Sequence, residues 1–264
     1  MNARLTGYTR NGFAARYHAY RPRPPEDLVG LLLQLAQTTR PDLVVDLGCG
    51  TGLSTRLWAA QCRRVIGIEP LDEMRSIATA DIHLNVELRA GVAQDTGLPA
   101  EVADIATCSQ SLHHMEPTAT FLEVHRILRP GGVFAAYDYE WPPVVHWEAE
   151  RAFFAFMDRV RELRRRRSVE SHMQRWDKAG HLDRMRDSGV FRLVRELFLH
   201  HREPCTAERW VGFALTIGDV APVLELGASD ADLGLDEFRR VAGRVLGDNG
   251  LPWHVSYRVR VGIK

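Results

Sequence analysis

The chain has 264 residues, enough to bury the core of one large domain or of one domain with a cap. Its 34 basic and 34 acidic residues give a formal net charge of +0, so no global field favours nucleic acid or an anionic membrane as a partner. No apolar stretch approaches the roughly 20 residues of a membrane helix, and the N-terminus lacks the apolar run of a signal peptide. Four separated cysteines without a C-x-x-C pair favour reduced thiols, so we expect a cytoplasmic protein without a membrane partner.

The first 25 residues are polar and end in a proline-rich run, Tyr20 to Pro25, that cannot continue a helix. A helix should follow, and its apolar face is formed by Leu28, Leu31, Leu32 and Leu35. We expect residues 1–40 to form an N-terminal segment and a lid helix.

Strand and helix patterns then alternate. The apolar runs predict strands near 43–47, 64–68, 86–90, 104–109 and 132–138, and the helical patterns lie near 53–61, 71–79 and 117–128. The Arg129–Gly132 turn should end the last of these helices and lead into the fifth strand. Such alternation predicts a parallel sheet that is covered by helices on both faces.

The most informative stretch follows the first strand. An apolar run ends at Asp46 and Leu47, and glycines then alternate at positions 48, 50 and 52 before a helical pattern resumes. This order predicts a buried strand, a turn that a ligand can approach closely, and a helix whose N-terminus faces that ligand. The dinucleotide fingerprint does not fit, because Leu53 stands where a third glycine is needed and Asp46 where an apolar residue is usual. Glu69, which ends the next apolar run, can accept hydrogen bonds from ribose hydroxyls.

The sequence Asp-Leu-Gly-Cys-Gly-Thr-Gly at 46–52, with Glu69 at the next strand end, closely resembles the class I S-adenosylmethionine-dependent methyltransferases, of the kind grouped as methyltransferase domain family 11. The resemblance is specific over about residues 40–140. It implies a Rossmann-like α/β fold with a seven-stranded, mostly parallel sheet whose last strand is antiparallel. It also implies S-adenosylmethionine as cofactor and S-adenosylhomocysteine as product.

The resemblance carries the cofactor residues with it. Gly48 and Gly50 would let the chain pass close to the methionine and ribose parts of the cofactor. Asp46 would hold its amino-acid end directly or through water, and Glu69 would bind the ribose diol. The other expected cofactor residues are Tyr20, Cys49, Gly52, Pro70, Met74, Ala93, Gln94, Ser109 and Gln110.

Two of these assignments have open alternatives. In the adenine loop at 91–99, Val92 stands where the family often has an acid, so either Gln94 or backbone groups contact adenine, or the register is shifted by one or two residues. Tyr20 resembles a tyrosine that folds over the cofactor in some small-molecule methyltransferases. Tyr17 is an equal candidate, and a plain proline-containing linker is the other interpretation.

Candidate catalytic residues follow the fourth strand. An ordinary ring pKa near 6.5 makes His113 or His114 a suitable general base at neutral pH, although either ring could instead cap the next helix or bond to the backbone. After the fifth strand, Tyr137, Tyr139 and Trp141 could stack on a flat substrate, or this stretch could be a hinge. A second histidine pair stands at His200 and His201. We expect no metal, since adjacent histidines of a strand point to opposite faces and neither pair has a third ligand at helical spacing.

The regular alternation of predicted strands and helices ends after residue 140. Helical patterns cover 144–176, 178–188 and most of 206–249, and strands are expected at 191–201 and 253–263. We therefore divide the rest of the chain into a cofactor-binding core at 41–142 and a segment at 143–264 that holds helical cap insertions and the last two strands.

These features predict a methyltransferase that acts by in-line displacement on a small molecule, with an oxygen, nitrogen, carbon or sulfur acceptor, as a monomer or homodimer. One alternative is a sensor or scaffold that binds the cofactor without methylating. Another is a nucleic-acid or protein methyltransferase, against which the near-zero charge and the lack of an Asn-Pro-Pro-Tyr-like element both count.

Overall fold

The computed structural model describes residues 12–80, 82–167 and 175–264. The chain divides into two compact units. The described residues of the first, here called the helical unit, fall within 1–22, 141–173 and 201–255. Those of the second, the sheet unit, fall within 23–140, 174–200 and 256–264.

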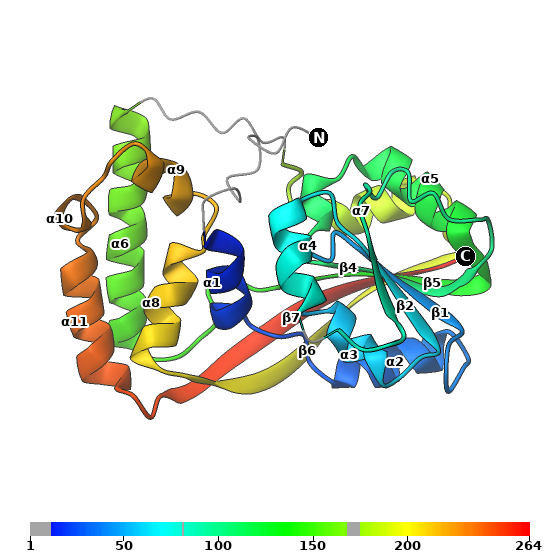
Figure 1. The fold of residues 1–264 in the computed structure, drawn as a ribbon, viewed down its shortest axis with the longest axis horizontal. Coiled ribbons are helices and arrows are strands. Elements are labelled where there is room, and N and C mark those ends of the chain that lie inside the picture. Colours follow the sequence, from blue (N-terminus) through cyan, green and yellow to red (C-terminus); the bar gives the residue numbers. More distant parts are fainter. Residues whose placement is uncertain (1–11, 81, 168–174) are drawn as a thin grey trace. The chain divides into compact units, whose positions relative to one another are not determined.

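The sheet has seven strands in the order β3-β2-β1-β4-β5-β7-β6 (Figure 1). Strands β1 to β5 pair in parallel, and β7 runs antiparallel to β5. This arrangement confirms the predicted α/β fold with a mostly parallel, seven-stranded sheet. The strands are β1 Leu43–Leu47, β2 Arg64–Ile68, β3 Val86–Arg89, β4 Ala103–Ser109, β5 Leu128–Tyr139, β6 Leu193–Cys205 and β7 Leu251–Ile263.

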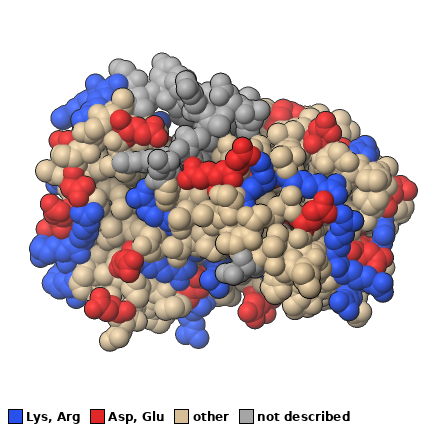
Figure 2. Space-filling model, in the orientation of Figure 1, with Lys and Arg blue, Asp and Glu red and all other residues tan. Residues whose placement is uncertain are grey.

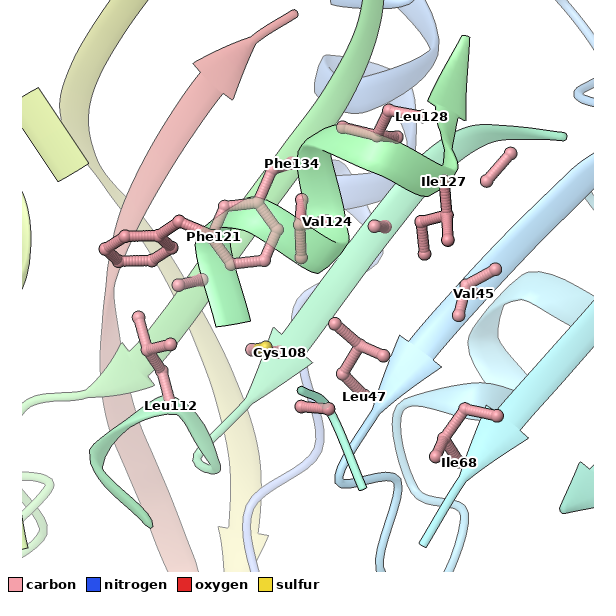
Figure 3. Close-up of a cluster of buried hydrophobic side chains, with 14 of the residues drawn as sticks. Val45, Leu47, Ile68, Cys108, Leu112, Phe121, Val124, Ile127, Leu128 and Phe134 are labelled. Carbon is pink, nitrogen blue, oxygen red and sulfur yellow. The ribbon is translucent and has the colours of Figure 1, made fainter. Parts of the chain in front are cut away.

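Helices cover both faces of this sheet, because successive strand residues point to opposite sides. On one face, Val45 and Phe134 pack in a core with Phe121 and Val124 of α5 (Figure 3). Met185 of α7 belongs to the same core. On the other face, the Thr55 hydroxyl of α3 donates to the Asp46 carboxylate of β1. The helices of the sheet unit are α2 Asp27–Leu35, α3 Thr55–Ala59, α4 Asp72–Thr79, α5 Pro117–Ile127 and α7 His181–Asp187, with a short 3-10 turn at Leu112–His114.

The helical unit has an aromatic core. The ring centroids of Phe153 and Trp210 are 5.2 Å apart, and those of Phe156 and Phe238 are 5.3 Å apart. Its helices are α1 Phe13–Tyr20, α6 Trp147–Arg166, α8 Ala207–Leu215, α9 Val220–Glu225, α10 Asp230–Leu233 and α11 Leu235–Leu246. Among the residues described, no helix combines the length and the apolar character that a membrane span requires.

The structure differs from the predicted elements in several places. Helix α1 was not predicted, because the polar residues around it hide a short apolar side on which Phe13 and Ala14 are buried. Helix α6 ends at Arg166, well before residue 176, and part of the remaining interval lies outside the described residues. Strand β5 already begins at Leu128, so the predicted turn before it is absorbed as an irregularity in the pairing of β4 with β5.

Candidate active site

The loop after β1, residues 48–52 and here called the glycine loop, is fastened to the end of β2. The backbone N–H groups of Gly48 and Cys49 donate to the Ile68 carbonyl at 2.8 and 3.1 Å. At Gly48, φ is +65° and a Cβ would lie 2.7 Å from that of Ser111, so only glycine fits there. Gly50 also has a left-handed φ of +56°, but a Cβ there would meet nothing within 4 Å. The glycine loop is therefore tight on its inner side and open at Gly50.

Glu69 follows β2 and faces this loop. Its carboxylate accepts hydrogen bonds from the backbone N–H groups of Gly50 and Leu71, both at 3.0 Å. Burial raises the pKa of Glu69, and these two N–H donors oppose the rise. An ionised carboxylate has about four acceptor sites, so lone pairs remain for the two hydroxyls of a ribose. The open space at Gly50 beside a positioned acceptor fits the expected nucleoside part of S-adenosylmethionine.

Asp46, also expected to contact the cofactor, has no exposed surface. Its two carboxylate oxygens accept from the hydroxyls of Thr55, at 2.7 Å, and Thr107, at 2.8 Å. These bonds join β1 to α3 and to β4. In this conformation Asp46 therefore holds the elements that flank the glycine loop and is not open to a ligand.

The remaining expected cofactor residues lie in several elements. Met74 and Ala93 are buried, whereas Pro70, Gln94 and Ser109 are half-buried. An isolated bridge between Val92 and Asp95 makes the adenine loop turn on itself, so which residue contacts adenine stays a prediction.

Tyr20 ends α1 in the helical unit. Its hydroxyl donates to Glu208 at 2.8 Å, and its ring packs where a side chain on Gly212 would lie. Its contacts within the helical unit therefore give no support to the predicted cofactor role.

The loop after β4 reaches the same edge of the sheet as the glycine loop. Gln110 has a φ of +53°, which is unusual for a residue with a side chain and indicates local strain. Its backbone N–H donates to the Tyr137 carbonyl at 3.0 Å, and the Ser111 hydroxyl donates to the Leu47 carbonyl at 2.8 Å. These bonds hold the ends of β1, β4 and β5 together, where open α/β sheets bind ligands.

His113 and His114 lie in this loop with ring centroids 3.9 Å apart. Burial, then nearby positive charge, lowers the pKa of His114 to about 4 and places that of His113 well below its ordinary value. Both rings are therefore neutral at neutral pH, but they are much weaker bases than an ordinary histidine. The general-base prediction assumed an ordinary ring pKa near 6.5, and the pKa of both rings is lower than that.

The three aromatic residues expected at the acceptor differ in exposure. Tyr137 is fully buried and its hydroxyl pairs with that of Ser54, while Tyr139 is buried against the edge of Tyr257. Trp141, in the helical unit, is 43% exposed. Burial does not favour a stacking role for the two tyrosines, and for Trp141 that role stays a prediction.

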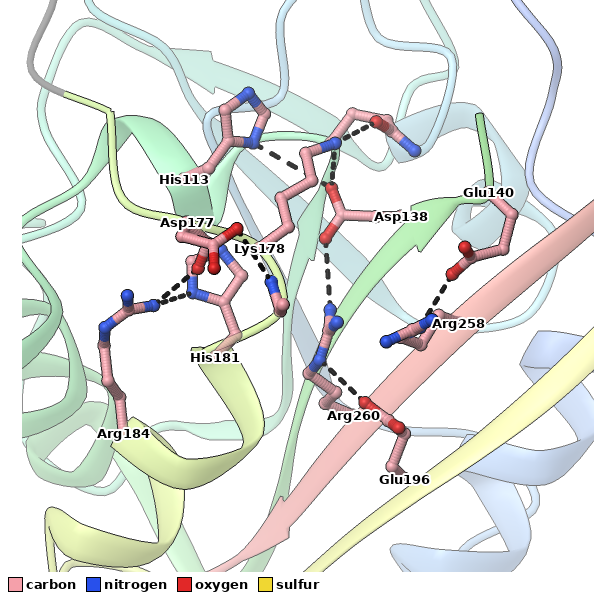
Figure 4. A network of polar contacts seen from close by, with 12 residues as sticks. His113, Asp138, Glu140, Asp177, Lys178, His181, Arg184, Glu196, Arg258 and Arg260 are labelled. Atoms are coloured by element: carbon pink, nitrogen blue, oxygen red, sulfur yellow. Dashed lines mark hydrogen bonds and ion pairs between the residues drawn. The ribbon is translucent and has the colours of Figure 1, made fainter. Parts of the chain in front are cut away.

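Asp138 belongs to the stretch after the fifth strand that the sequence placed near the acceptor, but its charged partners were not predicted (Figure 4). Glu196 pairs with Arg260 at 3.0 Å, Arg260 with Asp138 at 3.3 Å, and Asp138 with Lys178 at 2.7 Å. We call these four residues the charged row. Asp138 stands at the end of β5, which was a usable signal, but the pairing of β5 with β7 that brings Arg260 to it has no local signature.

The second histidine pair, His200 and His201, makes separate polar contacts and is not part of the charged row. His200 contacts the Ser256 hydroxyl at 2.8 Å, and His201 contacts Glu203 at 2.9 Å. Within the described ranges, no group of three or more histidine, cysteine, aspartate or glutamate side chains is arranged to hold a metal ion.

Comparisons with known proteins agree with this geometry. A family model described as a methyltransferase domain matches residues 45–136. The "Probable S-adenosylmethionine-dependent methyltransferase CRG1" of Saccharomyces cerevisiae is 32% identical over 159 residues, which cover 57% of this chain and 54% of that protein. The ubiquinone/menaquinone biosynthesis C-methyltransferase UbiE of Rubrivivax gelatinosus is 34% identical over 100 residues, or 38% of this chain and 40% of that protein.

The structural comparison extends further along the chain. A solved structure of a candidate type II methyltransferase from Anaeromyxobacter dehalogenans is 25% identical, with a TM-score of 0.66, and the match covers 92% of this chain and 98% of that one. The sequence matches to the curated relatives are shorter than this structural match. The chain spans about half the length of those relatives.

Proposed function

Because this chain carries, over residues 45–136, a methyltransferase domain of the class I S-adenosylmethionine-dependent family, we propose that the protein transfers a methyl group from this cofactor to a small-molecule acceptor. When bound, the cofactor supplies an activated methyl group on a sulfonium that is already a good leaving group. The task of the chain is then to align the acceptor in line with that methyl group and to exclude water. Such positioning supplies roughly 7–11 kcal/mol in favourable cases.

The observation that carries the proposal is the pairing of Glu69 with the open glycine at position 50. Glu69 is 6% exposed, and two backbone N–H groups orient its carboxylate, so this orientation does not depend on the ligand. An acceptor group held in advance in this way loses little conformational entropy when a ribose binds.

A small acceptor is supported by charge. The net charge is +0, and on the face drawn in Figure 2 acidic and basic residues are interspersed, with no wide basic stripe for a phosphate backbone. The name of the Rubrivivax gelatinosus relative also refers to ubiquinone and menaquinone biosynthesis. The four free cysteines support a cytoplasmic location, which we include in the proposal. We also propose that the protein is a monomer or a homodimer.

The cofactor part is tested by replacing Glu69. Loss of a hydrogen bond to a charged group costs about 1.5–3 kcal/mol, so Glu69→Ala should weaken binding of S-adenosylhomocysteine by about 10- to 150-fold in calorimetry. Glu87→Gln, at an exposed carboxylate on the neighbouring strand β3, is the matched control and should bind normally. Unchanged affinity in a folded Glu69→Ala protein would show that the ribose assignment is wrong.

Transfer itself is tested by a screen of candidate acceptors that measures release of S-adenosylhomocysteine. We expect at least one small organic acceptor to release product above the acceptor-free background. A complete blank from a protein that binds the cofactor would instead favour a sensor or scaffold.

A further inference from the structure

The charged row alternates in sign from one end to the other. It runs from the Glu196 carboxylate through Arg260 and Asp138 to the Lys178 ammonium (Figure 4). Arg260 is 1% exposed and Asp138 is 4% exposed, so the two central charges are compensated by their neighbours and by little water. The row ends in a cation, whose side chain is 38% exposed.

Lys178 has hydrogen-bonding capacity left over. An ammonium group has three N–H donors. Within the part of the chain that the structure describes, Lys178 donates one to the Gln110 side-chain oxygen, at 2.8 Å, and its ammonium group forms an ion pair with Asp138, at 2.7 Å. The amide nitrogen of the same Gln110 is buried and, among the described residues, has no hydrogen-bond partner. An anion with two oxygens would satisfy both donors.

Two cations, Lys178 and Arg175, act on the histidine rings beside this end of the row. The charges of Lys178 and Arg175 both act to lower the pKa of His113 and of His114, in addition to the effect of burial. The Asp138 carboxylate acts in the opposite direction on His114, whereas the two cations that disfavour an imidazolium at these rings would attract an anion to the same place. Since the loop that holds both histidines also holds Gln110, this place lies at the carboxyl edge of the sheet, where ligands bind in such folds.

We propose that Lys178, with the Gln110 amide beside it, binds a carboxylate of the methyl acceptor, so that the acceptors of this protein are organic acids. The proposal rests on the proposed function, because it assigns the acceptor of that same reaction. Lys178 then determines specificity: an acid extends the alternation of charges, whereas the neutral amide of the same acid does not.

The test uses the full chain loaded with S-adenosylhomocysteine. Calorimetry measures the binding of acetate, hexanoate, benzoate and phenylacetate, and of the primary amide of each. We expect at least one acid to bind and its amide to bind at least tenfold more weakly. Lys178→Met should weaken binding of that acid at least tenfold, and Lys178→Arg, which keeps the charge, should lie closer to the wild type. Lys264→Met, at the other lysine of the chain, is the matched control and should be unchanged.

Folding and cofactor binding are followed in every variant. Asp138 keeps Arg260 as a partner when Lys178 is replaced, so Lys178→Met should fold; if it does not, Lys178→Gln takes its place in the same measurement. The proposal is overturned if no acid binds better than its amide, or if the neutral variant binds acids as well as the wild type. Failure to bind S-adenosylhomocysteine would instead contradict the proposed function, and the acid panel is then judged by the same criteria on the unloaded protein.

Discussion

The Asp46 carboxylate lies beneath the glycine loop, and the hydroxyls of Thr55 and Thr107 are its hydrogen-bond partners. Removal from water disfavours the ionised form of a carboxyl group, whereas hydroxyl donors favour it. Burial is the larger effect here, and it raises the pKa of Asp46 to about 6. The residue that most clearly marks the cofactor loop in the sequence therefore makes folding dependent on pH.

The sign of this dependence can be tested with Asp46→Asn, which cannot ionise. In the unfolded chain the carboxyl has a pKa of about 3.9, so between about pH 4 and 6 the folded state binds more protons and its stability falls as the pH rises. From urea unfolding, the free energy of unfolding of the wild type, relative to the variant, should drop by about 2–3 kcal/mol over that range and stay level above it. A difference that is constant from pH 4 to 7 would contradict the raised pKa.

Among the elements, α1 shows how a helix with little apolar sequence is held by its neighbour. It packs on α8 within the helical unit, and the contact depends on a missing side chain (Figure 1). A Cβ on Gly212 of α8 would lie 2.3 Å from the Tyr20 ring, so only glycine allows the two helices to approach this closely. Arg21, just after α1, adds hydrogen bonds to the hydroxyl and the carbonyl of Thr216, just after α8.

We expect Gly212→Ala to destabilise this pair of helices. Overpacking typically costs about 1–3 kcal/mol, which for a chain of this size lowers the melting temperature by roughly 2–12 °C. Gly243→Ala is the matched control, because Gly243 lies on the exposed side of α11 and a Cβ there meets nothing within 4 Å. Alanine is the better helix former, so this control should melt slightly higher than the wild type. Equal melting temperatures for the two variants, measured by circular dichroism, would show that the tight contact is absent in solution.

For the whole molecule, the four cysteines are free and buried. They lie in both units, and burial raises the pKa of each thiol, to about 11 for Cys62 and about 12 for Cys205. Because the thiolate is the reactive form, the folded protein should resist thiol reagents although all four sulfurs are reduced.

A thiol titration without reductant checks this. We expect no rapid reaction with a disulfide reagent in native buffer, and four reactive thiols once the protein is unfolded in guanidinium. Fewer than four after unfolding would reveal a disulfide, and rapid reaction of the folded protein would show that a buried thiol becomes exposed.

Local patterns predicted the strands and most helices because a buried parallel strand needs an apolar run and a tight turn needs glycine. Local patterns did not predict features that depend on contacts between residues far apart in the chain. Helix α1 was not predicted, because most of its neighbours in the sequence are polar and only Phe13 and Ala14 are buried. The histidines at 113 and 114 were found by type, but their lowered pKa follows from burial and from charges on a distant segment.

The sequence by itself determined the fold class and the cofactor, because residues 46–52 and Glu69 are close in the chain and each has a local reason for its residue type. Only the tertiary structure decided that Asp46 is enclosed and that Lys178 meets Asp138 at the end of a row of charges. The physical reason is that the pairing of β5 with the antiparallel β7, and the return of the chain at 175–178, bring together side chains that are 40 residues apart, for Asp138 and Lys178, to 122 residues apart, for Asp138 and Arg260. Burial and electrostatic interactions arise only from such neighbours.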